Sequence, residues 1–299
     1  WLYNGVIGSK VGRMLMRKLN LVESPLLSGI NLQAELARRG VPVASAQTLA
    51  ALPETDRARA VIVVQDAFTS YFETPLLLDV FALLQRLGFV PLLAPFRANG
   101  KPLHVHGFLA RFEKVAAANV ASLQQLAASG LPLVGIDPSM TLTYRSEYAK
   151  LPGMGELPKV QLLQEWLASR LAELPADARA SQGDIGRASF TLLPHCTEKT
   201  NAPAAVGDWQ KVFAACGLNL ATRASGCCGM AGTFGHEADK RALSETIYRQ
   251  SWQGIVTGQR DDSPLLATGY SCRCQVALMD DVALPHPASA LLKALTPAA

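Results

Sequence analysis

Short apolar runs alternate with helical patterns through the middle of this 299-residue chain. Residues 61–64, 89–93 and 133–136 are almost continuously apolar, as strands are when helices cover both faces of their sheet. Between these runs, residues 76–87 and 109–126 carry apolar side chains at the spacing of a helix. The alternation predicts an α/β fold with a mostly parallel sheet flanked by helices.

Proline- and glycine-rich stretches divide the rest of the chain. Residues 151–158 close the first half, a helix with one apolar stripe is predicted over 159–174, and 175–186 is predicted to be a second linker. Residues 1–20 mix basic and apolar side chains and predict an amphipathic helix. That helix either packs on a neighbouring domain or lies on a membrane surface.

The second half of the chain repeats the first at an offset of about 130 residues. Phe190–Leu193 matches the run 61–64, and the helix predicted over 209–216 ends at a glycine, as the helix 76–87 does. Repetition of this kind marks a duplicated unit. We therefore predict two tandem, similar α/β domains with mostly parallel sheets, 55–175 and 176–299, after a helical lead-in, 1–54.

When the two copies are aligned, four cysteines of the second copy stand opposite residues of the first copy that cannot replace a thiolate. Cys196, Cys227, Cys228 and Cys272 correspond to Asp66, Ala98, Asn99 and Met140. The first domain is thus predicted to be a degenerate copy without cysteines, and the second to be the metal-binding copy. Asp66 and Asp137 are interpreted as turn and cap residues of the degenerate copy.

Composition narrows the class of protein. Apolar residues make up 49% of the chain and charged residues 17%, which favours a folded domain with a large core over disorder. The net charge of +4 does not indicate a nucleic-acid partner, and no apolar run is long enough for a membrane span. The chain begins with Trp1 rather than methionine, so we expect it to be a segment of a longer polypeptide.

All six cysteines follow residue 195: Cys196, Cys216, Cys227, Cys228, Cys272 and Cys274. No secretory signal precedes them, which favours reduced thiols and a cytoplasmic location, with attachment to the surface of the inner membrane as an alternative. Thiolates are the soft ligands that iron–sulfur clusters need. Because ligands gather at the carboxyl ends of parallel strands, we predict that Cys196, Cys227, Cys228 and Cys272 meet around one iron–sulfur cluster.

Several residues beside these cysteines are expected to support the cluster. Gly226 and Gly229 would let the backbone approach it closely. His195, His236 and Ser271 flank the cysteines, and the histidines could donate hydrogen bonds to its sulfur atoms, although ordinary loop histidines fit the sequence equally well. A helix that begins near His236 could direct its amino terminus toward the thiolates.

Other interpretations of the cysteines remain open. Four thiolates can also hold a structural zinc ion, although the adjacent pair Cys227-Cys228 is unusual for zinc. Cys216 lies on an apolar helix and is expected to be a small hydrophobic residue. Cys274 is either a fifth ligand or a spare thiol. His104 and His106, spaced to share one face of a strand, are expected to be exposed histidines.

Three sequence strings carry a specific resemblance: Leu-Pro-His-Cys-Thr-Glu-Lys-Thr-Asn-Ala-Pro, Gly-Cys-Cys-Gly-Met-Ala-Gly-Thr-Phe-Gly-His-Glu and Ala-Thr-Gly-Tyr-Ser-Cys-Arg. They resemble the cysteine-rich CCG-domain family, and most closely the carboxyl-terminal part of the large flavin- and iron–sulfur-containing D-2-hydroxyacid dehydrogenases. The resemblance covers about residues 55–285. The family's downstream motif is usually Cys-x-x-Cys, but Gly269 stands where the first of those cysteines would fall. This departure favours a four-thiolate [4Fe–4S] cluster, held by Cys196, Cys227, Cys228 and Cys272, over a five-thiolate non-cubane cluster.

The resemblance implies an oxidoreductase in which this chain transfers electrons. FAD and ferredoxin-like domains with further iron–sulfur clusters would precede it in the same polypeptide and oxidise D-2-hydroxyglutarate or D-lactate. Electrons would pass through the cluster to an acceptor that the resemblance does not identify. Two alternatives stay open: a zinc-stabilised structural or interaction module, and a reductase whose cluster itself acts on a small molecule or disulfide, as in the heterodisulfide reductase B subunit.

Overall fold

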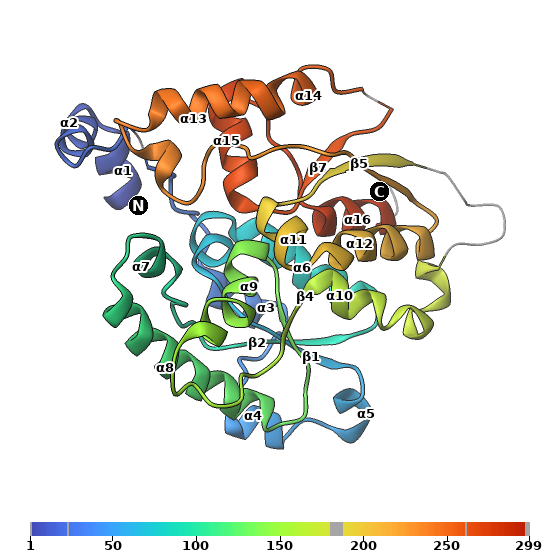
Figure 1. Ribbon diagram of the computed structural model, residues 1–299. Helices are drawn as coiled ribbons and strands as arrows, with labels where there is room; N and C mark the ends of the chain where they lie inside the picture. Colours follow the sequence, from blue (N-terminus) through green and yellow to red (C-terminus); the bar gives the residue numbers. More distant parts are fainter. Residues whose placement is uncertain (1, 23, 180–187, 261, 297–299) are drawn as a thin grey trace.

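The structure, a computed structural model, describes residues 2–22, 24–179, 188–260 and 262–296 (Figure 1). Within this part of the chain the strands form parallel sheets with helices on their faces, which confirms the predicted α/β fold. The first sheet has the order β2-β1-β3-β4, and the second has the order β6-β5-β7. The strands are β1 (Ala60–Val63), β2 (Val90–Leu93), β3 (Leu133–Gly135), β4 (Val160–Leu162), β5 (Ser189–Leu193), β6 (Asn219–Thr222) and β7 (Leu265–Ala267).

The first three strands of each sheet share one topology, and β4 has no counterpart in the second sheet. In each, the strand that comes first along the chain is central, the next strand pairs on one side of it, and the third pairs on the other side. β1, β2 and β3 therefore correspond to β5, β6 and β7. This common order supports the repetition that the sequence predicts.

The predicted helix over 159–174 is wrong at its beginning. Val160 to Leu162 form β4, which pairs in parallel with β3, and the helix that follows is α10 (Leu163–Ala168). A short 3₁₀ turn, η3 (Leu171–Glu173), completes the segment. Three residues are too few for an alternating pattern to be recognised, so the pairing with Leu133 and Val134 determines the strand.

A layer of helices separates the two sheets. Figure 1 shows α6 (Thr74–Arg86), α10, α12 (Pro203–Ala215) and α16 (Pro287–Leu295) between them. Their apolar side chains join one buried cluster with residues of both sheets, such as Val63, Leu192 and Leu266. The first unit, built on the sheet β2-β1-β3-β4, and the second unit, built on the sheet β6-β5-β7, are therefore held together by a common hydrophobic core.

The outer face of each sheet is covered separately. On the first sheet, α4 (Ala46–Ala50) and α8 (Leu109–Ala127) pack over Ile62 and Leu92. On the second sheet, α13 (Arg241–Tyr248), the π-helical turn η6 (Arg249–Gln253), α14 (Gly254–Val256) and α15 (Tyr270–Asp280) pack over Leu193 and Leu265. The remaining short helices are α3 (Leu32–Arg38), α5 (Glu54–Arg57), η1 (Phe68–Phe72), α7 (Lys101–Val105), α9 (Pro138–Arg145), η2 (Tyr148–Lys150), η4 (Ala176–Ala178), α11 (Cys196–Asn201) and η5 (Phe234–His236).

The predicted amphipathic helix over 1–20 is two helices, α1 (Leu2–Gly8) and α2 (Lys10–Lys18). Ser9 separates them because its hydroxyl accepts a hydrogen bond from the Gly12 amide and caps α2. Beyond α2, Leu21 pairs with Glu237 in an antiparallel bridge, so the lead-in reaches the second unit. In the described residues no helix combines the length and apolarity that a bilayer crossing requires.

The predicted linker over 175–186 lies partly outside the described residues, which end at 179 and resume at 188. The expected turn and cap roles of Asp66 and Asp137 are confirmed. Asp66 accepts hydrogen bonds from the amides of Phe68 and Thr69, and Asp137 caps α9 by accepting from the Met140 amide.

The carboxyl group of Asp66 is expected to make stability depend on pH. Burial, and then the charge of Asp137, raise the pKa of Asp66 to about 7. An unfolded aspartate ionises near pH 4, so between about pH 4 and pH 7 the folded chain keeps a proton that the unfolded chain has lost, and stability falls as the pH rises.

Asp66→Asn removes this titration while keeping an oxygen that can accept from the amides. We expect the thermal midpoint of the variant minus that of the parent protein to increase by roughly 5 °C from pH 4 to pH 8. Thermal unfolding across this range checks the prediction, and a difference between the two proteins that does not change with pH contradicts it.

Candidate metal centre

Four cysteines of the second unit form a row of contacting thiols. The Cys196 side chain hydrogen-bonds to Cys227, Cys227 also interacts with Cys228, and Cys228 with Cys272. Each comes after a strand of the second sheet: Cys196 begins α11 after β5, the pair lies in the loop after β6, and Cys272 lies in the first turn of α15 after β7. The three segments thus meet at the carboxyl edge of the sheet, as the fold class favours.

The thiols of this row differ in their tendency to ionise. Hydrogen bonds from Cys196 and then Cys228 lower the pKa of Cys227, because they stabilise its thiolate. The donating thiols of Cys196 and Cys228 keep their protons, and their pKa values are raised. Cys228 and Cys272 are buried, while Cys196 and Cys227 are exposed. The row therefore extends from the protein interior to the surface.

The four thiols bring soft sulfur donors together from three segments of the chain. Among the described residues no three cysteine, histidine or carboxylate side chains are arranged to hold one metal ion. The thiols contact each other in sequence along the row instead. Four soft sulfur donors from three segments are the ligands that a [4Fe–4S] cluster uses.

The imidazole of His195 occupies the space next to Gly269, the position that departs from the Cys-x-x-Cys motif. A Cβ atom on Gly269 would lie 2.2 Å from His195 Cδ2, far inside contact distance. The His195 Nδ1 accepts a hydrogen bond from the Thr197 amide, which leaves Nε2 to donate to Ser271 Oγ at 3.2 Å. Burial lowers the pKa of His195 and favours this neutral form. A fifth cysteine at position 269 does not fit beside this histidine.

The loop that carries the cysteine pair is fixed to the helices behind it. Gly229 has φ of +91°, and a Cβ atom there would lie 2.3 Å from the Ser244 carbonyl oxygen. A Cβ atom on Gly226 would lie 2.4 Å from Ser251 Oγ, and the indole of Trp252 donates to the Gly226 carbonyl. Both glycines therefore allow the loop to approach α13 and η6.

Glu198 connects two of the cysteine-bearing segments, and helix α10, behind the row. It is fully buried and accepts hydrogen bonds from Thr268 Oγ1 at 2.6 Å and from Gln164 Nε2 at 2.7 Å. The Thr268 hydroxyl in turn accepts from the His195 amide. Burial raises the pKa of Glu198 to about 7. This network fixes α11 relative to β7 and α10.

Cys274 and His236 face each other away from the row. The Cys274 sulfur lies 3.9 Å from His236 Nε2, and it also interacts with the Tyr270 hydroxyl. Residues two apart on an α-helix point in different directions, so Cys274 does not share the face of Cys272. His236 lies in η5, and the helix predicted to begin near it, α13, begins instead at Arg241. Cys216 packs against the shared core, as expected of a small hydrophobic residue.

The corresponding positions of the first unit also lie together. The Asn99 amide donates to the Met140 carbonyl oxygen at 3.1 Å and approaches the Met140 sulfur at 3.7 Å. These residues are the predicted counterparts of Cys228 and Cys272, which contact each other in the second unit. The duplication is therefore visible in the site itself, and in the first unit an amide and a thioether take the place of two thiols.

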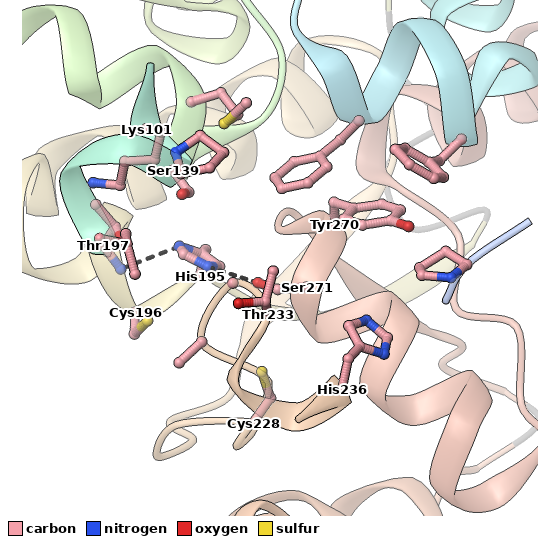
Figure 2. Close-up of a pocket in the computed structure, with 18 of the residues that line it drawn as sticks. Lys101, Ser139, His195, Cys196, Thr197, Cys228, Thr233, His236, Tyr270 and Ser271 are labelled. Carbon is pink, nitrogen blue, oxygen red and sulfur yellow. Dashed lines mark hydrogen bonds between the residues drawn. The ribbon is translucent and has the colours of Figure 1, made fainter. Parts of the chain in front are cut away.

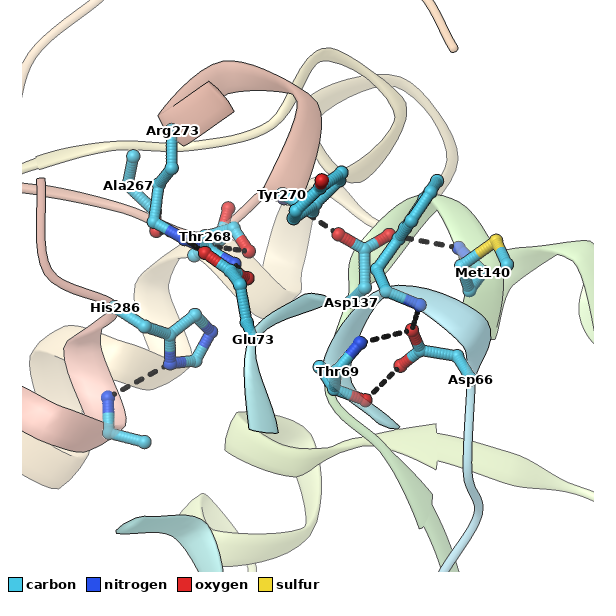
Figure 3. Close-up of polar contacts among 12 residues, drawn as sticks. Asp66, Thr69, Glu73, Asp137, Met140, Ala267, Thr268, Tyr270, Arg273 and His286 are labelled. Carbon is cyan, nitrogen blue, oxygen red and sulfur yellow. Dashed lines mark hydrogen bonds and ion pairs between the residues drawn. The ribbon is translucent and has the colours of Figure 1, made fainter. Parts of the chain in front are cut away.

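The first unit contacts the helix that carries Cys272 (Figure 3). Asp137 accepts a hydrogen bond from the Tyr270 amide at 2.8 Å, and the Tyr270 ring stacks on Phe68 with centroids 4.4 Å apart. Arg273, buried between Cys272 and Cys274, forms a two-pronged ion pair with Glu73 of the first unit. Sequence reasoning missed all of these contacts.

A cavity of about 470 Å³ lies beside the exposed end of the cysteine row (Figure 2). Cys196, Cys227 and Cys228 are among its lining residues, together with His195 and Ser271. His106 also lines it and approaches Thr233 Oγ1 across the two units. His104 and His106 do not share the face of a strand as predicted, because residues 101–105 form the helix α7.

Comparison with known proteins finds long relatives. No family model matches the chain. The chain is 50% identical over 98% of its length to D-2-hydroxyglutarate dehydrogenase of Pseudomonas putida KT2440 and covers 28% of that protein. It is 40% identical over 96% of its length to D-2-hydroxyglutarate dehydrogenase of Haemophilus influenzae, again covering 28%. The chain thus spans little more than a quarter of the length of these curated relatives.

A more distant relative has another name. It is a subunit of the anaerobic glycerol-3-phosphate dehydrogenase of Escherichia coli K12. The chain is 25% identical to it over 76% of its own length and covers 57% of that protein. By name, this relative and the two D-2-hydroxyglutarate dehydrogenases belong to oxidoreductases.

Proposed function

We propose that this chain is the iron–sulfur electron-transfer part of a flavin-dependent D-2-hydroxyacid dehydrogenase. The observation that carries the proposal is the row of contacting thiols formed by Cys196, Cys227, Cys228 and Cys272. Similarity to proteins named D-2-hydroxyglutarate dehydrogenase over nearly the whole chain supports that hydroxyacid as the substrate of the complete enzyme. D-lactate is the second candidate substrate.

The residues of this chain would hold, orient and shield the cluster. A [4Fe–4S] cluster bound by the four cysteines would accept and release single electrons. Cys228 and Cys272 would hold it from the buried side. His195, which precedes Cys196 in the sequence, lines the same cavity, and its Nε2–H donates to Ser271 Oγ. Hydrogen-bond donors and burial around cluster sulfur atoms set the reduction potential. No bond of the hydroxyacid needs to break in this chain.

The rest of the enzyme would lie in the same polypeptide. The chain covers 28% of its long relatives. We propose that it corresponds to their carboxyl-terminal part, and that FAD and ferredoxin-like domains precede it in the same polypeptide. The basic helix α2 and the residue after it expose Val11, Leu15 and Leu19, which suits a surface that such a domain would cover. Because reduced cysteines are needed, we place the whole protein in the cytoplasm.

Iron and sulfide analysis of the chain tests this proposal. After anaerobic reconstitution we expect a brown protein with absorbance near about 400 nm that dithionite bleaches, and iron and acid-labile sulfide in equal amounts. A colourless protein that binds one zinc ion per chain would instead identify a zinc-stabilised module. A paramagnetic resonance signal that changes on addition of a thiol or disulfide would favour a cluster that itself acts on a substrate.

A further inference from the structure

The cavity beside the cysteine row, here called the interface cavity, is formed by three parts of the chain. The lead-in contributes Leu21 and Pro25, the first unit contributes α7 and η1, and the second unit contributes the cysteine loops. Its volume of about 470 Å³ is in the range of sites that bind a small organic molecule. The cavity therefore has room for a ligand where the two units meet.

One wall of the interface cavity is made of aromatic rings. Phe68 and Tyr270 stack with an interplanar angle of 17°, and the Phe72 ring lies 5.9 Å from Tyr270. Figure 2 shows Tyr270 on one side of the cavity and Cys196 and Cys228 on the other. A flat ring bound between them would contact the aromatic wall and approach the thiols that hold the cluster.

The charges of the cavity wall do not suit an acidic ligand. Lys101 is the one lysine, arginine, aspartate or glutamate among the described lining residues, and its ammonium is paired with Glu147. Both side chains of this pair are largely buried, at 18% and 12% exposure. A dicarboxylate such as D-2-hydroxyglutarate would find no second lysine or arginine among these residues, whereas a neutral ligand needs none.

Polar groups are placed at separate points of the wall. Ser271 Oγ lies next to His195 Nε2, and on the surface side His106 Nε2 lies 3.3 Å from Thr233 Oγ1. Hydroxyl and imidazole groups can donate hydrogen bonds to carbonyl oxygens of a ring. His106 is exposed, so its imidazole can hydrogen-bond to water as well as to a bound ligand.

We propose that the interface cavity binds a neutral quinone, which is the electron acceptor of the complete enzyme. This inference rests on the proposed function. Oxidation of a D-2-hydroxyacid to the 2-oxoacid releases two electrons and two protons at the upstream flavin. The electrons would reach the quinone one at a time by way of a cluster held by the four cysteines, and the quinone would take up two electrons and, from water, two protons to become the quinol. Each hydroxyacid oxidised thus reduces one quinone.

Substitution in the cavity of the full-length polypeptide tests the inference, with 2,3-dimethoxy-5-methyl-1,4-benzoquinone as the acceptor. Val105 lines the cavity from α7 and is 55% exposed, so Val105→Trp can fill it without disturbing the core. In Val105→Trp we expect the KM for the quinone to rise about tenfold or more. In Phe72→Ala we expect this KM to rise about three- to tenfold, because a ring contact with the quinone is lost. Leu243→Trp, an equally exposed apolar position on α13 that does not line the cavity, is the matched control.

Reduction of ferricyanide by the same proteins should stay unchanged, because that small ion does not need the cavity. An azidoquinone photolabel provides a readout without turnover, and we expect it to attach to peptides containing residues 68–72, 101–106 or 270. An unchanged KM in Val105→Trp, labelling confined to other peptides, or no quinone reduction at all would overturn the inference. Iron and sulfide analysis of each sample separates these outcomes from failure of the proposed function, in which the cluster itself is absent.

Discussion

Cys228→Ser is expected to abolish cluster binding by this chain. Cys228 lies inside the row and contacts both Cys227 and Cys272, so its loss interrupts the donor set at its centre. Serine preserves the size of the side chain but offers a hard oxygen that is a poor substitute for a soft thiolate. We expect iron and sulfide per reconstituted chain to fall below about one tenth of the parent value, with loss of the visible absorbance.

The chain supplies two matched controls for this substitution. Cys216→Ser changes a thiol that packs against the shared core, and it should leave iron and sulfide unchanged. Cys274→Ser changes the thiol that faces His236, and we expect the cluster to remain, although its spectrum can shift. A reconstituted Cys228→Ser protein with the full iron content, or equal loss in Cys216→Ser, would show that the row is not the binding site.

The sequence predicts much of the fold because buried strands leave a clear pattern. The apolar runs 61–64, 89–93 and 133–136 coincide closely with β1, β2 and β3, since both faces of these strands are covered. In β4 the polar Gln161 interrupts the apolar residues, and in β6 Leu220 is buried while the other three positions are exposed, so neither strand shows such a run. Their existence depends on pairing with distant strands, which a local pattern does not contain.

The four proposed ligands could be predicted from the sequence because a cysteine has few roles, and because the internal repeat aligned each of the four cysteines with a position of the first copy. Cys196 and Cys272 are 76 positions apart, yet each contacts one member of the Cys227-Cys228 pair. The sequence could not show that His195 takes the space beside Gly269, because that depends on a side-chain orientation. It also did not indicate the cavity, which three distant segments enclose.

The contacts between the units were missed for a similar reason. Glu73 and Arg273 are 200 residues apart, and each is of a type that usually lies on the surface. One signal was available: Arg273 directly follows Cys272, a predicted ligand at a buried site, and precedes Cys274, a ligand or a spare thiol. Such an arginine is rarely buried without a partner, and the partner is then expected to be a carboxylate.

Glu73→Gln is expected to destabilise the protein because it leaves the buried guanidinium of Arg273 without its counter-charge. Arg273 Nε lies 2.9 Å from Glu73 Oε1, and a second contact joins Arg273 Nη2 to Glu73 Oε2. Arg273 is 5% exposed and also donates to the carbonyl oxygens of Ala267 and Thr268. Because Glu73 is partly exposed, we expect a loss of about 2 kcal/mol, less than for a fully buried pair, and a fall in thermal midpoint of about 4–8 °C.

Two comparisons show whether charge or position is responsible. Asp262→Asn removes an ion pair with Arg260 that is largely exposed, so no measurable change in stability is expected. In the double variant Glu73→Leu/Arg273→Met both charges are removed, and we expect stability to recover in part, because no buried charge is left unpaired.

If the ion pair also fixes α15, the double variant regains stability but still loses its reconstituted cluster faster than the parent protein, since Cys272 lies on that helix. Thermal unfolding and the decay of visible absorbance in air measure the two effects separately, and a Glu73→Gln protein equal to the parent in both would show that the first unit does not hold the cysteine-bearing helix in place.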